Sequence, residues 1–164
     1  MPTTYEPIAT TTLGSAAASI TFSSIPGTYT DLRLVFVGTG TASSNCQIRF
    51  NSDSTSTYSQ TALYGTGAAA GSSRNSDTAF YFTYYTNLST TIPTLRTMDI
   101  FSYAGSTKKT CLTTENSDLN GSGSVVRTAG LWPVTSAITS ILLLNPSSTF
   151  AAGTTATLYG ILKA

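Results

Sequence analysis

The sequence predicts an all-β fold, an antiparallel β-sandwich of about eight to ten strands with jelly-roll-like connections. Three observations predict it. Charged residues make up only 9% of the 164 residues, whereas the β-branched and aromatic residues that fit a pleated surface are plentiful. Apolar and polar residues alternate in most segments, which is the period of a strand. Turns rich in Gly, Pro, Asn and Ser separate these segments. None of the segments has the 3.6-residue period of a helix.

Strands are expected wherever this alternation is bounded by turn residues. In the clearest case Leu32, Leu34 and Phe36 share one face, while Arg33 lies on the other. The expected strands are residues 17–22, 30–38, 45–51, 79–86, 95–103, 107–115, 124–132, 137–144 and 155–162. The side chains expected to be largely buried are Leu32, Leu34, Phe36, Ile48, Phe50, Met98, Ile100, Trp132, Ile141 and Leu158.

Two segments are less regular than the others. Residues 137–144 could form a helix, but the Asn-Pro pair that follows and the Ser and Thr content favour a buried strand. Residues 52–76 are dominated by Ser, Thr, Gly and Ala, and 65–73 are expected to form an exposed loop. No repeat or linker divides the chain, so residues 1–164 are expected to form a single domain.

The N-terminal residues 1–13 have a different composition. Pro2 and Pro7 cannot donate backbone hydrogen bonds, so this stretch suits an edge strand or an extended arm rather than a central strand. We favour the arm, which would lie on a neighbouring subunit or on a larger assembly. Tyr5 and Ile8 are the side chains large enough to anchor it there.

Residues 79–86 carry large side chains on both faces of the expected strand, with Phe80, Phe82 and Tyr84 on one and Tyr81 and Tyr85 on the other. A sandwich strand needs only one apolar face. We therefore predict a subunit contact through the two tyrosines of the second face, because tyrosine is enriched at interfaces. The alternative is that the chain's own loop covers this face. The low charge of the whole chain also favours association.

The cysteines and the only adjacent lysines fit structural roles. Cys46 alternates with apolar residues and is expected to point into the core, whereas Cys111 is expected to face the other way. A disulfide between them is therefore not expected, because bridging needs Cβ vectors that face each other. Lys108 and Lys109 are expected to form a solvated turn.

Catalytic and metal-binding chemistry has little basis in this sequence. Histidine is absent, which removes the commonest general base and metal ligand. A glycosidase pair could be drawn from the scattered carboxylates, and residues 51–55 have the alternating oxygens of a calcium loop. Surface solvation and a simple turn explain these features better. We expect no enzyme, no metal and no cofactor.

The charge distribution predicts neither a nucleic-acid partner nor a membrane partner. The net charge is +1, and the eight basic residues are scattered rather than clustered. No apolar run is long enough to cross a membrane. The first residues lack the basic and apolar regions of a signal peptide, so none is expected.

Eight stretches form a pattern that runs across the chain: residues 5–10 (YEPIAT), 19–32 (SITFSSIPGTYTDL), 49–51 (RFN), 63–65 (LYG), 103–106 (YAGS), 129–132 (AGLW), 137–141 (AITSI) and 156–161 (ATLYGI). This pattern resembles that of a widespread group of bacteriophage virion proteins. The resemblance extends over most of the chain and contains no catalytic motif. Residues 52–76 match least well.

The resemblance implies a β-sandwich displayed on a virion, with the major capsid protein or other virion proteins as partners. We expect a capsid decoration or cement protein, because the chain is one compact domain with few charges and no fibrous repeat. We also predict a homotrimer, from the family and from the geometry of shells. The alternative is a tail- or head-fibre module that binds host-surface carbohydrate. A glycan-active enzyme is a third and weaker alternative.

Overall fold

The computed structural model describes residues 4–55 and 58–162, which contain β-strands and no helix. The strands are β1 (Tyr5–Thr12), β2 (Ser19–Phe22), β3 (Asp31–Gly38), β4 (Gln47–Phe50), β5 (Tyr58–Gly65), β6 (Ala70–Asp77), β7 (Phe80–Tyr81), β8 (Thr94–Phe101), β9 (Lys109–Asp118), β10 (Gly123–Trp132), β11 (Ile141–Leu144) and β12 (Thr155–Ile161). This described part of the chain also holds no helix long and apolar enough to cross a membrane.

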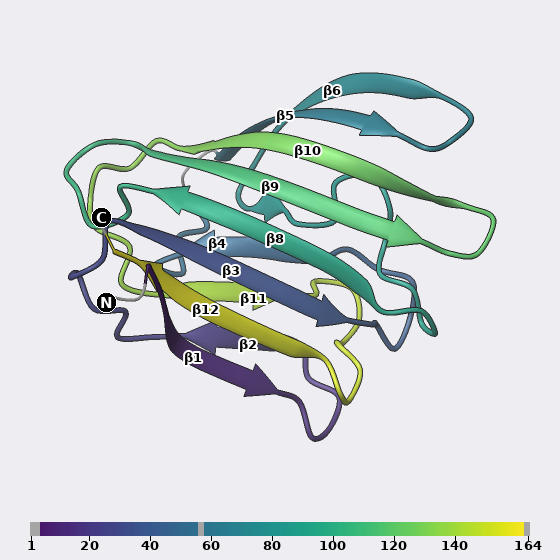
Figure 1. Cartoon of the computed structure of the whole chain (residues 1–164), viewed down its shortest axis with the longest axis horizontal. Helices are drawn as coiled ribbons and strands as arrows, with labels where there is room; N and C mark the ends of the chain where they lie inside the picture. Colours follow the sequence, from purple (N-terminus) through teal and green to yellow (C-terminus); the bar gives the residue numbers. More distant parts are fainter. Residues whose placement is uncertain (1–3, 56–57, 163–164) are drawn as a thin grey trace.

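The strands form two layers, which confirms the all-β sandwich (Figure 1). The larger sheet has eight strands in the order β1-β12-β3-β8-β9-β10-β5-β6, and the smaller has four in the order β2-β11-β4-β7. Neighbouring strands are antiparallel throughout, as expected. Twelve strands divided into eight and four exceed the expected number, and this division does not confirm a jelly roll.

The core lies between the two sheets and follows the alternation of the sequence. Every side chain that was predicted to be buried has an exposed fraction of 1% or less. Phe50 of the small sheet packs against Trp132 and Phe80, with ring centroids 5.6 and 5.5 Å apart. On the large sheet, Phe36 packs against Phe150 with centroids 5.5 Å apart. The contact between Phe50 and Trp132 joins the two layers, because β4 belongs to the small sheet and β10 to the large one.

The expected loop at 65–73 is wrong, because β5 and β6 form a hairpin there. The two strands pair along their whole length, from Tyr58 opposite Asp77 to Gly65 opposite Ala70. The amide of Thr66 donates to the carbonyl of Ala69 at 2.9 Å and closes the turn. The Ser-rich sequence hid these strands because β6 is the last strand of its sheet and is largely exposed.

The N-terminal segment is an edge strand rather than the favoured arm. Residues Tyr5–Thr12 pair with β12 of the same sheet. The register shifts between Pro7 and Ala9, where Ile8 has no opposite residue and packs against the core. A proline and a bulge are common at sheet edges because they discourage further pairing. Residues 1–3 of the expected arm lie outside the described residues.

Several expected strands are shorter in the structure, and the difference is largest for residues 79–86 and 137–144, where side chains supply hydrogen bonds in place of part of the strand ladder. Only Phe80–Tyr81 and Ile141–Leu144 pair as strands. Asn51 supports the residues before β11: its Oδ1 accepts from the amides of Thr139 and Ser140 at 2.8 and 3.1 Å. Asn51 has a positive φ of 51° and begins the turn that the sequence predicted after β4.

The expected orientation of Cys111 and the solvated position of Lys109 are both wrong. Both side chains point into the sandwich from β9, with exposed fractions of 4% and 0%. The Lys109 ammonium donates to the carbonyls of Gly105, Thr107 and Thr135. These hydrogen bonds offset the hydration that the ammonium loses on burial. Lys109 can therefore lie on the core-facing side of β9 together with Cys111.

The two thiols are free and buried. Burial raises the pKa of Cys46 to about 12 and also raises the pKa of Cys111. A thiol with a raised pKa is a poor nucleophile, since the thiolate is the reactive form. Both cysteines therefore act as small core residues, which was expected for Cys46 alone.

Replacing Lys109 with methionine is expected to lower the free energy of unfolding by about 1–3 kcal/mol, because buried carbonyls lose their donor. Urea denaturation would measure this loss. Lys108→Met is the matched control, because Lys108 is adjacent and exposed. Equal midpoints for the two variants would contradict a structural role for the buried ammonium.

Candidate functional site

The most elaborate site lies around residues 80–86, which we name the tyrosine segment. Phe80 and Phe82 are buried, whereas Tyr81 and Tyr84 are half-buried and Tyr85 has an exposed fraction of 49%. The segment pairs with β4 only through its first two residues. Its phenylalanines therefore anchor it in the core while its tyrosines remain accessible.

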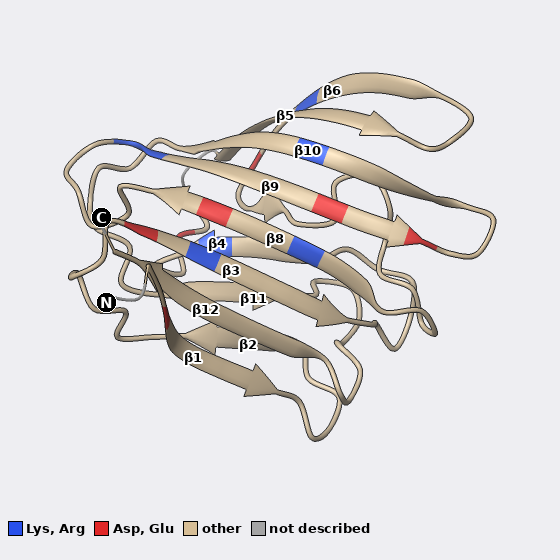
Figure 2. Ribbon diagram, in the orientation of Figure 1, with Lys and Arg blue, Asp and Glu red and all other residues tan. Residues whose placement is uncertain are grey.

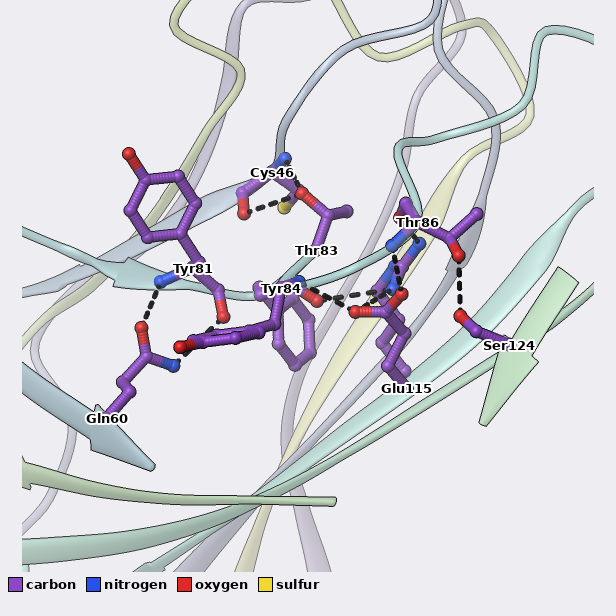
Figure 3. A network of polar contacts seen from close by, with 10 residues as sticks. Cys46, Gln60, Tyr81, Thr83, Tyr84, Thr86, Glu115 and Ser124 are labelled. Atoms are coloured by element: carbon purple, nitrogen blue, oxygen red, sulfur yellow. Dashed lines mark hydrogen bonds and ion pairs between the residues drawn. The ribbon is translucent and has the colours of Figure 1, made fainter. Parts of the chain in front are cut away.

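Gln60 of β5 fixes the start of the tyrosine segment (Figure 3). The amide of Tyr81 donates to Gln60 Oε1 at 2.7 Å, and Gln60 Nε2 donates to the carbonyl of Tyr81 at 3.0 Å. Gln60 is 3% exposed. Its side chain thus supplies the donor and the acceptor that a neighbouring strand would otherwise offer to this residue.

A buried ion pair fixes the end of the segment. Arg96 of β8 and Glu115 of β9 are opposite each other in the large sheet and both point into the sandwich. Arg96 Nη1 lies 3.0 Å from Glu115 Oε2, and the two side chains are 0% and 2% exposed. A charged pair at this depth needs further hydrogen bonds to offset its lost hydration.

The tyrosine segment supplies those further hydrogen bonds. The Glu115 carboxylate accepts from the amides of Tyr84 and Thr86 at 2.7 and 2.9 Å. Arg96 donates to the carbonyls of Phe82 and Thr86 at 3.3 and 3.1 Å. Figure 3 shows these bonds converging on the segment from the two strands. The ion pair therefore serves as the hydrogen-bonding partner of an irregular backbone.

The remaining contacts tie the segment to the rest of the sandwich. The amide of Cys46 donates to Thr83 Oγ1 at 2.8 Å. The hydroxyls of Thr86 and Ser124 are 2.5 Å apart. Apolar residues of similar volume often stabilise a core as well as a buried ion pair does. The network is therefore best explained by the one backbone conformation that it selects.

Two hollows flank the tyrosine segment. One of about 290 Å³ is lined by Ser73, Arg74, Asn75, Tyr81 and Tyr84. The other, of about 510 Å³, lies beside Tyr85 and includes Leu119 and residues 86–90. Tyr85 stacks on Tyr64 of β5, with ring centroids 4.3 Å apart and planes 24° apart. The tyrosine segment therefore forms the boundary between two surface recesses.

The structure separates the four residues predicted to form an interface. Tyr81 and Tyr85 lie in the tyrosine segment, and Tyr85 stacks on Tyr64 of β5, next to the β6 edge of the large sheet. Tyr5 and Ile8 lie on β1, at the opposite edge. Tyr5 is 45% exposed beneath the guanidinium of Arg33, whereas Ile8 is half-buried against its own core. The four residues therefore do not form one surface.

Sequence reasoning missed Gln60, Arg96 and Glu115, although a signal for one of them exists. Arg96 is two residues before Met98, and the strand period places both on the core face. A charged residue in register with buried apolar residues indicates an internal partner. The partner lies on another strand, so only the register of the sheet identifies it.

The carboxylates occupy structural positions. Asp53 accepts from the indole of Trp132 at 3.0 Å, and Asp99 pairs with Arg33 at 2.6 Å. Asp77 accepts from the hydroxyl of Tyr81 at 2.9 Å, and hydrogen bonds from Thr78 and Tyr81 lower the pKa of Asp77. Within residues 4–55 and 58–162, no group of acidic residues and cysteines is placed to hold a metal ion. The hollow beside Tyr81 and Tyr84 is lined by aromatic, neutral polar and one basic side chain.

Comparison with known proteins adds no relative: no protein-family model matches the chain, and the curated proteins contain no significant match.

Proposed function

We propose that the chain is a non-enzymatic structural protein of a bacteriophage particle, a decoration or cement protein that stabilises the capsid shell. It would act as a homotrimer in the virion, with the major capsid protein as its partner. The sequence stretches that resemble virion proteins support this proposal. Several of them fall in strands of the sandwich, including residues 19–22 in β2 and 156–161 in β12.

The observation that carries the proposal is the outer face of the large sheet. Leu63 and Val125 are 65% and 61% exposed there, and Val37 and Leu95 lie opposite each other with 42% and 43% exposure. These apolar side chains share one face of the sheet with polar ones, because Asn116 lies between Leu95 and Val125 and Arg127 lies opposite Leu63. Several large apolar side chains exposed on one face are consistent with an interaction surface.

The sparse charge of the sandwich fits the same role. Figure 2 shows that charged residues occupy few positions on the strands. Strands β2, β5, β7, β11 and β12 carry none. A surface with little charge does not repel further copies of itself, so it favours the dense packing of subunits on a shell.

Electron cryo-microscopy of intact particles tests the proposed location. Copies that cover the shell, grouped in threes, are expected for a cement protein. A few copies confined to the tail or to fibres would contradict the shell role and favour the fibre module.

Binding to capsids stripped of decoration tests the surface. Leu63→Lys and Val125→Lys are each expected to weaken binding by about tenfold or more, because a charge would enter a desolvated contact. Thr21→Lys is the control, since Thr21 is exposed on the small sheet. Unchanged binding of both outer-face variants would show that this face does not contact the shell.

A second candidate function is a fibre module that binds host-surface carbohydrate. The hollow beside Tyr81 and Tyr84 favours it, because it combines aromatic rings with neutral polar groups.

A further inference from the structure

We propose that the hollow formed by Ser73, Asn75, Tyr81 and Tyr84 is a binding site for one pyranose unit of a saccharide. Its volume of about 290 Å³ is close to the lower end of small-molecule sites, about 300 Å³. A single sugar ring is therefore the ligand that its size suits. The inference goes beyond a shell-stabilising role and does not depend on where in a particle the chain lies.

The tyrosines supply an apolar surface for the sugar. One face of a pyranose presents mainly C–H groups, which pack on an aromatic ring, while the hydroxyls remain free for hydrogen bonds. In Figure 3 the ring of Tyr84 is seen nearly edge-on, and the ring of Tyr81 points away from it. The hydroxyl of Tyr81 is engaged by Asp77, which fixes that ring at the border of the hollow.

Polar groups with unused hydrogen-bonding capacity complete the site. Among the described residues, the side chains of Ser73, Asn75 and Tyr84 have no hydrogen-bond partner. Ser73 and Asn75 lie opposite Ala62 and Gln60, so they share the side of β6 that faces the tyrosine segment. These groups provide donors and acceptors in the lining of the hollow that contains the tyrosine rings.

Arg74 lies at the rim of the hollow and has a different role. It is opposite the exposed Thr61, so it leaves β6 on the other side of the strand. Its guanidinium has no ion-pair or hydrogen-bond partner among the described residues. Arg74 also lines the hollow, so its positive charge favours a carboxylated sugar over its neutral counterpart.

The buried network explains why the site is rigid. Gln60 holds the backbone of Tyr81, and Glu115 holds that of Tyr84, each from a side chain that is almost fully buried. A binding group that is fixed before the ligand arrives loses less entropy on binding. The buried Arg96–Glu115 pair thus contributes to binding by holding the backbone of the tyrosine segment in one conformation.

Nuclear magnetic resonance of the isolated, ¹⁵N-labelled full chain tests the site directly. The probes are the methyl glycosides of glucose, galactose and glucuronic acid at millimolar concentration. At least one is expected to cause saturable shifts at the amides of Ser73, Asn75 and Tyr84. Tyr84→Ala and Asn75→Ala are each expected to weaken that binding about tenfold or more. Arg74→Gln is expected to weaken binding of the glucuronide alone.

Tyr159→Ala is the control, because Tyr159 is a half-buried tyrosine on β12, far from β6 in the order of the sheet. If Tyr84→Ala fails to fold, Asn75→Ala on the edge strand gives the same readout. Absence of shifts with all three glycosides overturns the proposal, as does binding that neither variant weakens. The hollow would be a protein contact instead if the chain bound none of the sugars and Tyr84→Ala or Asn75→Ala weakened its binding to capsids. The capsid assays test the shell role separately.

Discussion

Replacing Arg96 with methionine is expected to lower the free energy of unfolding by about 3–5 kcal/mol, because it leaves the Glu115 carboxylate buried without its cation. The substitution also removes the donor to the carbonyls of Phe82 and Thr86. Methionine keeps much of the side-chain volume, so the loss reports charge and hydrogen bonding more than packing. Urea denaturation followed by tryptophan fluorescence measures it, since Trp132 is in the core.

Arg127→Met is the matched control for this variant. Arg127 lies on β10, two strands from β8 in the same sheet, and is exposed on the outer face, so its replacement should change the free energy of unfolding by less than about 0.5 kcal/mol. The double variant Arg96→Met/Glu115→Leu separates the ion pair from its role toward the segment. It removes the uncompensated charge, but the amides of Tyr84 and Thr86 still lose their acceptor. A double variant as stable as the unmodified chain would contradict that role.

Replacing Phe36 with alanine is expected to cost about 3–5 kcal/mol, the usual penalty for emptying a buried aromatic site. Phe36 is 0% exposed, and its ring contacts Phe82 and Phe150 at centroid distances of 6.1 and 5.5 Å. The cavity would therefore open between the large sheet and the anchor of the tyrosine segment. The same denaturation experiment measures this loss.

Phe101→Ala is the control for the emptied core site. Phe101 lies on β8 but is 43% exposed, so its loss should cost about 1 kcal/mol or less. Similar denaturation midpoints for the two alanine variants would mean that the Phe36 side chain does not face the core.

The sequence was sufficient to predict the core because burial follows a simple period in this chain. Leu32, Leu34 and Phe36 alternate with more exposed residues along β3, and all three are fully buried. The predicted orientation of the side chains of β9 was wrong for a related reason. A solvated Lys109 would place Cys111 on the outer side of β9 as well, whereas the Lys109 ammonium is buried and donates to backbone carbonyls.

The candidate site could not be predicted because its parts come from different strands. Gln60, Arg96 and Glu115 belong to β5, β8 and β9, and their common target is an irregular segment. The alternation of large residues in 80–86 suggested a full strand, but only Phe80–Tyr81 pair as a strand. The amides of Phe82 and Thr83 both donate to the carbonyl of Cys46, and side chains supply the partners of the residues that follow. Residues 65–73 were predicted as a loop because propensity is weak in an exposed edge hairpin.

The position of β12 between β1 and β3 has a consequence for how the chain folds. Tyr5 pairs with Ile161, so the first strand of the chain has no neighbour in its sheet until the last strand has been synthesised. Contacts between such distant residues slow folding, because a long loop must close before they form. During translation the N-terminal strand remains without its sheet partner, and its Pro7 bulge then limits wrong pairing with other nascent chains. Formation of the complete large sheet is thus coupled to the synthesis of β12.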